Sequence, residues 1–153
     1  MTLTDRSSLA RGLRVARACA RWLLAFLFAM ACSYKLLNFT AFYGTVVRVE
    51  WLTDLPGGLL RFVAGAVVGL EAFLAWRFAS GSEAARRVAP LAMLALTVFT
   101  AAILTMSAVE CSCYWQWMPG QSNDRLVLGA RNAVIISLCI VVAWKKRGVP
   151  DEA

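Results

Sequence analysis

Four long apolar runs constrain this chain more than any other feature of its sequence. They cover about residues 21–37, 59–78, 88–107 and 126–144, close to the roughly 20 residues that a helix needs to cross a bilayer. Within hydrocarbon only helices and closed barrels satisfy the polar groups of the backbone. Hydrophobic residues make up 60% of the 153 in the chain, well above an ordinary soluble domain. The sequence therefore predicts an all-α membrane protein, a four-transmembrane-helix bundle in one domain.

Basic residues gather at one end of these predicted spans. They lie in residues 1–20, in the turn of residues 80–87 between the second and third spans, and at Lys145–Arg147. Because cytoplasmic loops carry an excess of Lys and Arg, both termini are expected in the cytoplasm. We therefore divide the chain into a basic tail without a predicted fold (1–20), a membrane domain (21–147) and a short cytoplasmic tail (148–153). The net charge of +7 is then explained by basic residues that set the orientation of the chain in the cytoplasmic membrane. No nucleic-acid partner is therefore predicted.

The tryptophans favour the same orientation, because Trp is enriched at both membrane–water interfaces. The tryptophans at the predicted inner ends of spans are Trp22, Trp76 and Trp144. Those at the predicted outer ends are Trp51, Trp115 and Trp117. Two aromatic belts of this kind place the loop after the third span on the extracytoplasmic side.

The segment of residues 39–55 is interrupted by charged residues and does not read as a span. Its apolar residues recur at helical spacing, at Phe39, Phe42, Tyr43, Val46 and Val47. This pattern predicts a short amphipathic helix at the outer membrane surface. Pro56-Gly57-Gly58 is expected to end it and to start the second span.

Small residues and a proline add detail to the second and third spans. Gly65 and Gly69 form a small-xxx-small pair, which predicts a close approach by a neighbouring helix. Pro90 is expected in the first turn of the third span, where its missing N–H is tolerated.

Four ionisable side chains lie within the predicted spans: Lys35, Arg61, Glu71 and Arg131. Each costs about 2.5–3.5 kcal/mol at the centre of a membrane helix, so each needs a partner or a route to the surface. By residue count, the three cations lie in the outer third and Glu71 nearer the middle. Arg131 is the predicted partner of Glu71, with Asn132 and Thr97 as polar neighbours, since Lys35 fits less well by depth. The alternative is that Lys35 and Arg61 extend to the interface.

Two cysteines one residue apart, Cys111 and Cys113, follow the third span. The Cα atoms of such residues lie roughly 5.5–7 Å apart, at the edge of what a disulfide tolerates. A disulfide there would be strained and easily reduced, which suits an electron carrier. Buried cations beneath the pair would favour thiolate, although Glu110 opposes that effect. The alternative is two reduced thiols at a helix end.

Other residues narrow the chemistry further. The chain has no histidine, which excludes His-ligated haem, His-containing zinc sites and His-based acid–base catalysis. Cys19, Cys32 and Cys139 lie in or beside apolar runs, where a thiol is usually a packing group. Cys32 is also considered as a third participant in thiol exchange, because it lies in the outer half of the first span.

Several of these landmarks together resemble the MauE/DoxX family of four-helix membrane proteins, its methylamine-utilisation MauE branch in particular. They occur in the expected order over nearly the whole chain, as Tyr34-Lys35-Leu36, Phe42, Pro56, Gly69-Leu70-Glu71, Cys111-Ser112-Cys113 and Arg131-Asn132. In the family pattern the second cysteine is usually followed by Phe-Gly, whereas here Tyr114-Trp115 follow it. A Trp in place of Gly disfavours a left-handed turn at that point.

The resemblance implies a fold related in outline to the DsbB and vitamin K epoxide reductase membrane enzymes. It also implies thiol–disulfide chemistry with an extracytoplasmic thioredoxin-like partner, in support of the maturation of a disulfide-containing protein. Cys111 and Cys113 are then the catalytic pair, and Lys35, Arg61, Glu71, Arg131 and Asn132 are the supporting polar residues. A quinone takes the electrons in the enzymes of similar outline, although no residue of this sequence requires one.

Two other functions are compatible with the sequence. The chain could be a non-enzymatic assembly or accessory subunit of a larger membrane complex, docking through its close-packing glycines and its surface helix. A Cu(I) site is the lesser alternative, because four soft sulfur ligands lie on one short segment: Met106, Cys111, Cys113 and Met118. No metal site is assigned on this basis.

Overall fold

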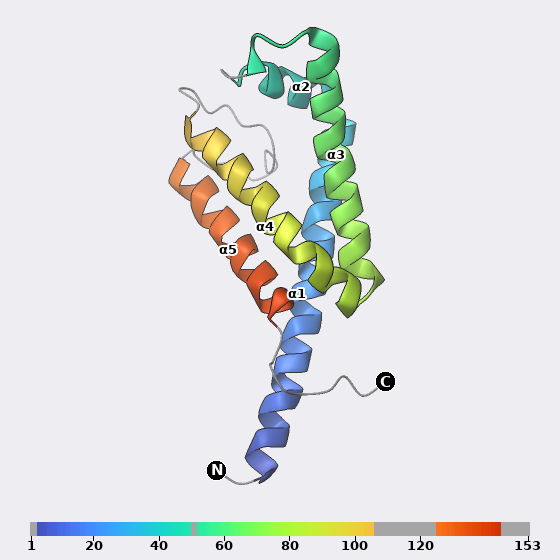
Figure 1. Ribbon diagram of the computed structural model, residues 1–153, viewed down its shortest axis with the longest axis vertical. Coiled ribbons are helices and arrows are strands. Elements are labelled where there is room, and N and C mark those ends of the chain that lie inside the picture. Colours follow the sequence, from blue (N-terminus) through green and yellow to red (C-terminus); the bar gives the residue numbers. More distant parts are fainter. Residues whose placement is uncertain (1–2, 50–51, 106–124, 145–153) are drawn as a thin grey trace.

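The computed structural model describes residues 3–49, 52–105 and 125–144 (Figure 1). All regular secondary structure in these ranges is helical. The helices are α1 (Leu3–Leu37), α2 (Phe39–Val47), α3 (Gly57–Ser80), α4 (Ser82–Thr105) and α5 (Arg125–Ala143). The prediction of an all-α fold is therefore confirmed for the part of the chain that the structure describes.

Within the described residues, three segments are long and apolar enough to cross a membrane: Arg11–Leu37 of α1, the whole of α3, and Ser82–Ala101 of α4. A shorter apolar helix covers Gly129–Ala143. These helices coincide with the four apolar runs of the sequence and are what a multi-pass membrane protein requires. Large apolar side chains remain exposed along them, Phe62, Leu94 and Val134 among others. Such an exposed apolar surface is suited to lipid.

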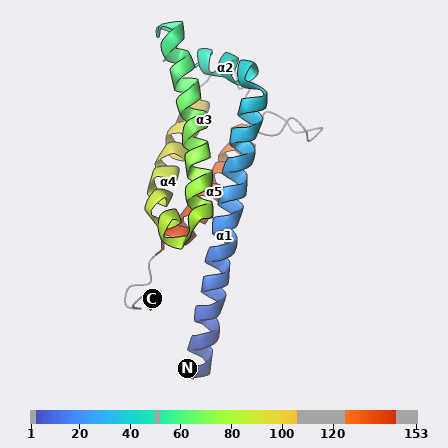
Figure 2. The same ribbon diagram turned by 90° about the vertical axis from the view of Figure 1, so that its right-hand side faces the viewer.

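Helix α1 is longer than the sequence predicts. It begins at Leu3, so the segment that we expected to be a tail without a fold is helical. The amino-terminal part of α1 extends well past the ends of the other helices (Figures 1 and 2). The helix ends at Leu37, but the N–H of Asn38 still donates to the carbonyl of Tyr34 at 3.0 Å. Only a local change of direction at Asn38 separates α1 from α2.

Helix α2 crosses between the end of α1 and the start of α3 (Figure 2). It is shorter than the predicted surface segment, because it ends at Val47. Its buried residues are Phe42 and Val46, both part of the predicted apolar stripe. Pro56 directly precedes α3 and accepts hydrogen bonds from the N–H groups of the first helical turn, as the sequence predicts.

The connection between α3 and α4 differs from the predicted basic turn of residues 80–87. Gly81 alone separates the two helices, with φ 149° and ψ 168°. This is a backbone conformation that is essentially restricted to glycine. Because α4 begins at Ser82, Pro90 lies inside the helix and not in its first turn. It therefore removes one backbone hydrogen bond from the interior of α4.

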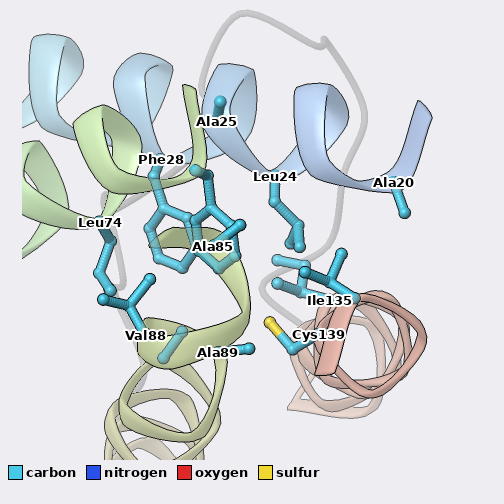
Figure 3. Packing of buried hydrophobic residues seen from close by; sticks show 13 residues of the cluster. Ala20, Leu24, Ala25, Phe28, Leu74, Ala85, Val88, Ala89, Ile135 and Cys139 are labelled. Atoms are coloured by element: carbon cyan, nitrogen blue, oxygen red, sulfur yellow. The ribbon is translucent and has the colours of Figure 1, made fainter. Parts of the chain in front are cut away.

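The largest buried cluster joins α1, α3, α4 and α5 (Figure 3). The rings of Phe28 and Phe78 stack with their centroids 5.8 Å apart and their planes 7° apart, holding α1 to α3. On α4, Ala85, Ala89 and Ala92 are completely buried. Small side chains at these positions let the neighbouring helices approach closely.

A second buried cluster lies toward the other end of α1 and α3. It contains Cys32, Phe42 and Val46, together with Leu52, Leu60, Ala64 and Val68. Phe42 and Val46 of α2 thus pack on the beginning of α3, which fixes the crossing helix in place.

The glycine pair of α3 makes no close contact with the other described helices of this chain. A Cβ atom built at Gly65 or Gly69 would meet no atom within 4 Å, and both positions are exposed. The close contacts of α3 are made by Ala64 and Val68, one residue earlier in each case. The glycines instead form an open strip on the outer surface of α3.

Candidate functional site

A buried ion pair connects α1 to α3. The ammonium of Lys35 donates to Oε1 of Glu71, and the two side chains are 2% and 16% exposed. The rings of Phe42 and Phe99 also lie near the ammonium, 5.4 and 5.9 Å from Nζ to their centroids. Aromatic faces attract a cation at such distances. The structure therefore gives Lys35 a charged partner and an aromatic surround inside the bundle.

This pairing corrects the prediction that Arg131 is the partner of Glu71. Two contacts join α1 to α3, the stack of Phe28 on Phe78 and the ion pair of Lys35 with Glu71. Along α1 the ion pair lies seven residues after the stack, whereas along α3 it lies seven residues before the stack. The two helices are consequently antiparallel. Side chains of a helix lean toward its amino terminus, so Lys35 and Glu71 lean toward each other from opposite directions. This lean removes the difference in depth that made Lys35 the less favoured partner.

Asn132 of α5 forms the second polar contact in the interior. It is 2% exposed, and its Nδ2 donates to Oγ1 of Thr100 on α4 at 2.8 Å. Its Oδ1 accepts from Nε and Nη2 of Arg131, both at 3.4 Å. Thr97, the neighbour predicted from the sequence, is exposed and donates to the carbonyl of Met93 instead. The partner is thus the next threonine along α4, on its inner side.

Arg61 lies apart from these groups. It is exposed, and its guanidinium carbon lies 5.9 Å from the ring centroid of Tyr43 on α2. The hydroxyl of Tyr43 donates to the carbonyl of Gly57 at 3.5 Å, next to the start of α3. This position agrees with the alternative that Arg61 extends to the surface, and it separates Arg61 from the buried ion pair.

A cavity of about 360 Å³ lies between α1, α3, α4 and α5, and we call it the central cavity. Its polar lining consists of Lys35, Glu71, Arg131 and Asn132. The rest is apolar and includes Phe28, Leu94, Val98, Phe99 and Ile135. Four of the five polar residues predicted for the site therefore line one cavity, and Arg61 does not. No single sequence signal indicated the cavity, because it depends on how the four helices pack.

The predicted catalytic pair, Cys111 and Cys113, lies outside the described residues, and so do the methionines of the predicted Cu(I) site. The three described cysteines are free thiols: Cys19 is exposed, and Cys32 and Cys139 are buried. Cys32 belongs to the second apolar cluster, which agrees with a packing role. In the described ranges no group of three or more His, Cys, Asp or Glu residues could hold a metal ion.

Comparison with curated proteins and with solved structures finds no match. A family model does match, that of the methylamine utilisation protein MauE, over residues 13–145. The match covers the helices α2 to α5, most of α1, and the segment that contains Cys111 and Cys113. It therefore includes every residue predicted for the site, and the chain belongs to the MauE family.

Proposed function

We propose that this chain is a membrane thiol–disulfide redox protein that serves methylamine utilisation. It would pass electrons or disulfides between Cys111-x-Cys113 and an extracytoplasmic thioredoxin-like protein. That partner would in turn support the maturation of a disulfide-containing protein. The observation that carries the proposal is the MauE family match, which includes this cysteine pair in a chain with membrane-length helices.

The proposal includes a topology. Four spans with both termini in the cytoplasm would put Cys111 and Cys113 on the extracytoplasmic side of the cytoplasmic membrane. The Lys and Arg distribution supports this orientation. So does the exposure of Trp22, Trp76 and Trp144, which are 55%, 62% and 67% exposed near the proposed inner side. An extracytoplasmic location is oxidising, which a cysteine pair needs in order to cycle through a disulfide.

The chemistry proposed for the pair is thiol–disulfide exchange. A thiolate of one protein attacks the disulfide of the other and forms a mixed disulfide, releasing one thiolate. The second cysteine of the attacking pair then displaces the remaining partner sulfur. One protein ends as a disulfide and the other as a dithiol, so no electrons are gained or lost overall. A membrane quinone is the electron acceptor that we propose for reoxidation, taking two electrons and two protons from the dithiol to become a hydroquinone.

Among the supporting residues, the structure favours different roles from those expected. Since Lys35 is neutralised by Glu71, it contributes little to a positive field beneath the cysteines. Its role is better described as fixing α1 against α3. Asn132 joins α4 to α5 in the same way, through Thr100. We therefore propose that these residues position the bundle and are not reacting groups.

The proposal is tested by following the redox state of the partner in membranes with an alkylation gel-shift. Cys111→Ser and Cys113→Ser should each change the oxidised fraction of the partner, whereas Cys19→Ser should not, because it replaces an exposed thiol on α1 far along the chain from the pair. If both single variants leave partner oxidation unchanged while the protein is present at normal levels, the redox function is wrong.

A second candidate is an assembly or accessory subunit of a membrane complex. The exposed strip at Gly65 and Gly69 favours it, because small residues on a lipid-facing surface allow another helix to pack closely. Under this function a stoichiometric membrane partner should co-purify, and its binding should survive loss of both Cys111 and Cys113. Gly65→Leu should weaken that binding, whereas Ala66→Leu, at the neighbouring exposed position, serves as the control.

A further inference from the structure

The central cavity has an opening on the side of α4. Its lining residues Leu91, Leu94 and Val98 are 42%, 62% and 55% exposed. In a membrane this face of α4 meets the acyl chains of the lipids, so a molecule dissolved in the bilayer can reach the cavity without crossing water. Phe28 and Phe99 contribute aromatic rings to the lining. A volume of about 360 Å³ is in the range of small-molecule sites, which are mostly apolar with a few placed polar groups.

The polar groups of the cavity differ in how their hydrogen bonds are satisfied. Asn132 has a partner for its amide nitrogen in Thr100 and for its oxygen in Arg131. Lys35 donates to Oε1 of Glu71. Oε2 of Glu71, in contrast, is buried and accepts no hydrogen bond within the described part of the chain. A buried acceptor left without a donor costs about 1–3 kcal/mol. Glu71 lines the cavity with 16% of its side chain exposed, and this exposed part does not include Oε2.

We propose that the central cavity binds an apolar, membrane-soluble molecule that carries a hydroxyl group. A rotation of the Glu71 side chain brings Oε2 to the cavity, where the ligand hydroxyl donates a hydrogen bond to it, and the apolar body occupies the space between Phe28, Leu94 and Phe99. Lys35 donates to Oε1 and Oε2 has no donor, so the ligand supplies the missing donor. The inference concerns this cavity alone and does not depend on the chemistry of the cysteine pair.

Two sources share this chemistry, a phenol such as a hydroquinone and the hydroxyl of an aliphatic lipid. Binding to the full-length protein in lipid nanodiscs separates them, with a decyl-substituted hydroquinone, its dimethyl ether and decanol as probes. We expect the hydroquinone to bind about tenfold more tightly than its ether, since the ether has the same body but no donor. Decanol binding as tightly as the hydroquinone identifies an aliphatic source, and weaker decanol binding identifies an aromatic one. Equal binding of hydroquinone and ether overturns the proposal, because the cavity would then take any apolar body.

Two variants with a control locate the site. Leu94→Trp fills the opening without touching the ion pair and should abolish hydroquinone binding. Phe62→Trp adds the same side chain to α3 at a position 71% exposed and outside the lining, and it should leave binding unchanged. Glu71→Gln presents an amide donor beside the acceptor, so the preference should shift from the hydroquinone toward the ether. Where Glu71→Gln does not fold, unchanged binding in Leu94→Trp still contradicts the proposal.

Discussion

Lys35 and Glu71 form an ion pair in the interior of the bundle, between two antiparallel helices. The two residues are 36 positions apart in the chain, so the pair fixes the register of α1 against α3. The contact is nearly inaccessible to solvent, and neither charge can be removed alone without leaving the other uncompensated. Variants of the two residues therefore test how much this ion pair contributes to the stability of the fold.

We expect Lys35→Met alone, or Glu71→Leu alone, to lower the free energy of unfolding by about 3–5 kcal/mol, because each leaves one buried charge unpaired. The double variant should recover most of that loss, since well-packed apolar residues often replace a buried pair without net cost. Unfolding in detergent micelles, followed by circular dichroism against denaturant, measures both effects.

The exposed ion pair of Glu83 with Arg86 and Arg87 on α4 is the matched control. Glu83→Gln should change the free energy of unfolding by less than about 1 kcal/mol, because exposed pairs contribute little. Additive losses in the double variant of Lys35 and Glu71 would contradict the buried pair.

The hydrogen bond between Asn132 and Thr100 should contribute measurably to the packing of α5 on α4. Thr100→Val keeps the shape of the side chain and removes the hydroxyl that accepts from Asn132. We expect a loss of about 0.6 kcal/mol and at most about 1.7 kcal/mol, the average and the maximum for such bonds between membrane helices. Thr97→Val removes a hydroxyl that bonds only within its own helix, and it should have a smaller effect. Equal effects of the two changes would argue against the interhelical bond.

Gly81 should tolerate no other residue without cost. At φ 149° and ψ 168°, Gly81→Ala places a Cβ in a conformation that costs about 1–3 kcal/mol. Gly65→Ala is the same change in the interior of α3, where a Cβ meets nothing within 4 Å. There it should stabilise the helix by about 0.5–1 kcal/mol. Thermal unfolding of both variants in the same detergent compares them, and a destabilising Gly65→Ala would contradict the open surface of α3.

Single-cysteine variants should report the topology and the burial of the thiols together. A membrane-impermeant maleimide applied from outside should label Cys111 or Cys113 after reduction, and it should leave Cys19 unlabelled until the cytoplasmic side is opened. Cys32 and Cys139 are buried and should react only after denaturation. Labelling of Cys19 from the outside, with Cys111 and Cys113 protected, would reverse the proposed orientation.

The positions of the membrane-length helices were predictable from the sequence, because long apolar runs have few alternatives in a bilayer. The spacing of Phe42 and Val46 predicted the helix α2, but it predicted contact with the membrane surface, whereas both residues pack on α3. The early start of α1 at Leu3 was not predictable in this way, since a hydropathy pattern identifies apolar helices and does not indicate a polar one. The single-residue connection at Gly81 was not predicted, because the polar and basic segment of residues 80–87 was interpreted as a turn although most of it belongs to α4.

The partners within the site were harder to predict than its members. Glu71, Lys35 and Asn132 were recognised because polar residues are rare in apolar runs. Pairing Glu71 with Arg131 relied on depth alone, and depth ignores the rotation of each helix and the lean of its side chains. The prediction named Thr97 as a polar neighbour and missed Thr100 for the same reason, because only the rotation of α4 decides which hydroxyl points inward.

The glycine junction between α3 and α4 has a consequence for biosynthesis. With one residue between them, the two helices cannot be separated by the width of a bilayer, so we expect them to enter the membrane together as a hairpin. Helix α4 carries a proline and a charged first turn, whereas the central part of α3 is apolar except for Glu71, whose charge is paired with Lys35. The ribosome therefore delivers the less favourable segment already attached to the one that inserts readily.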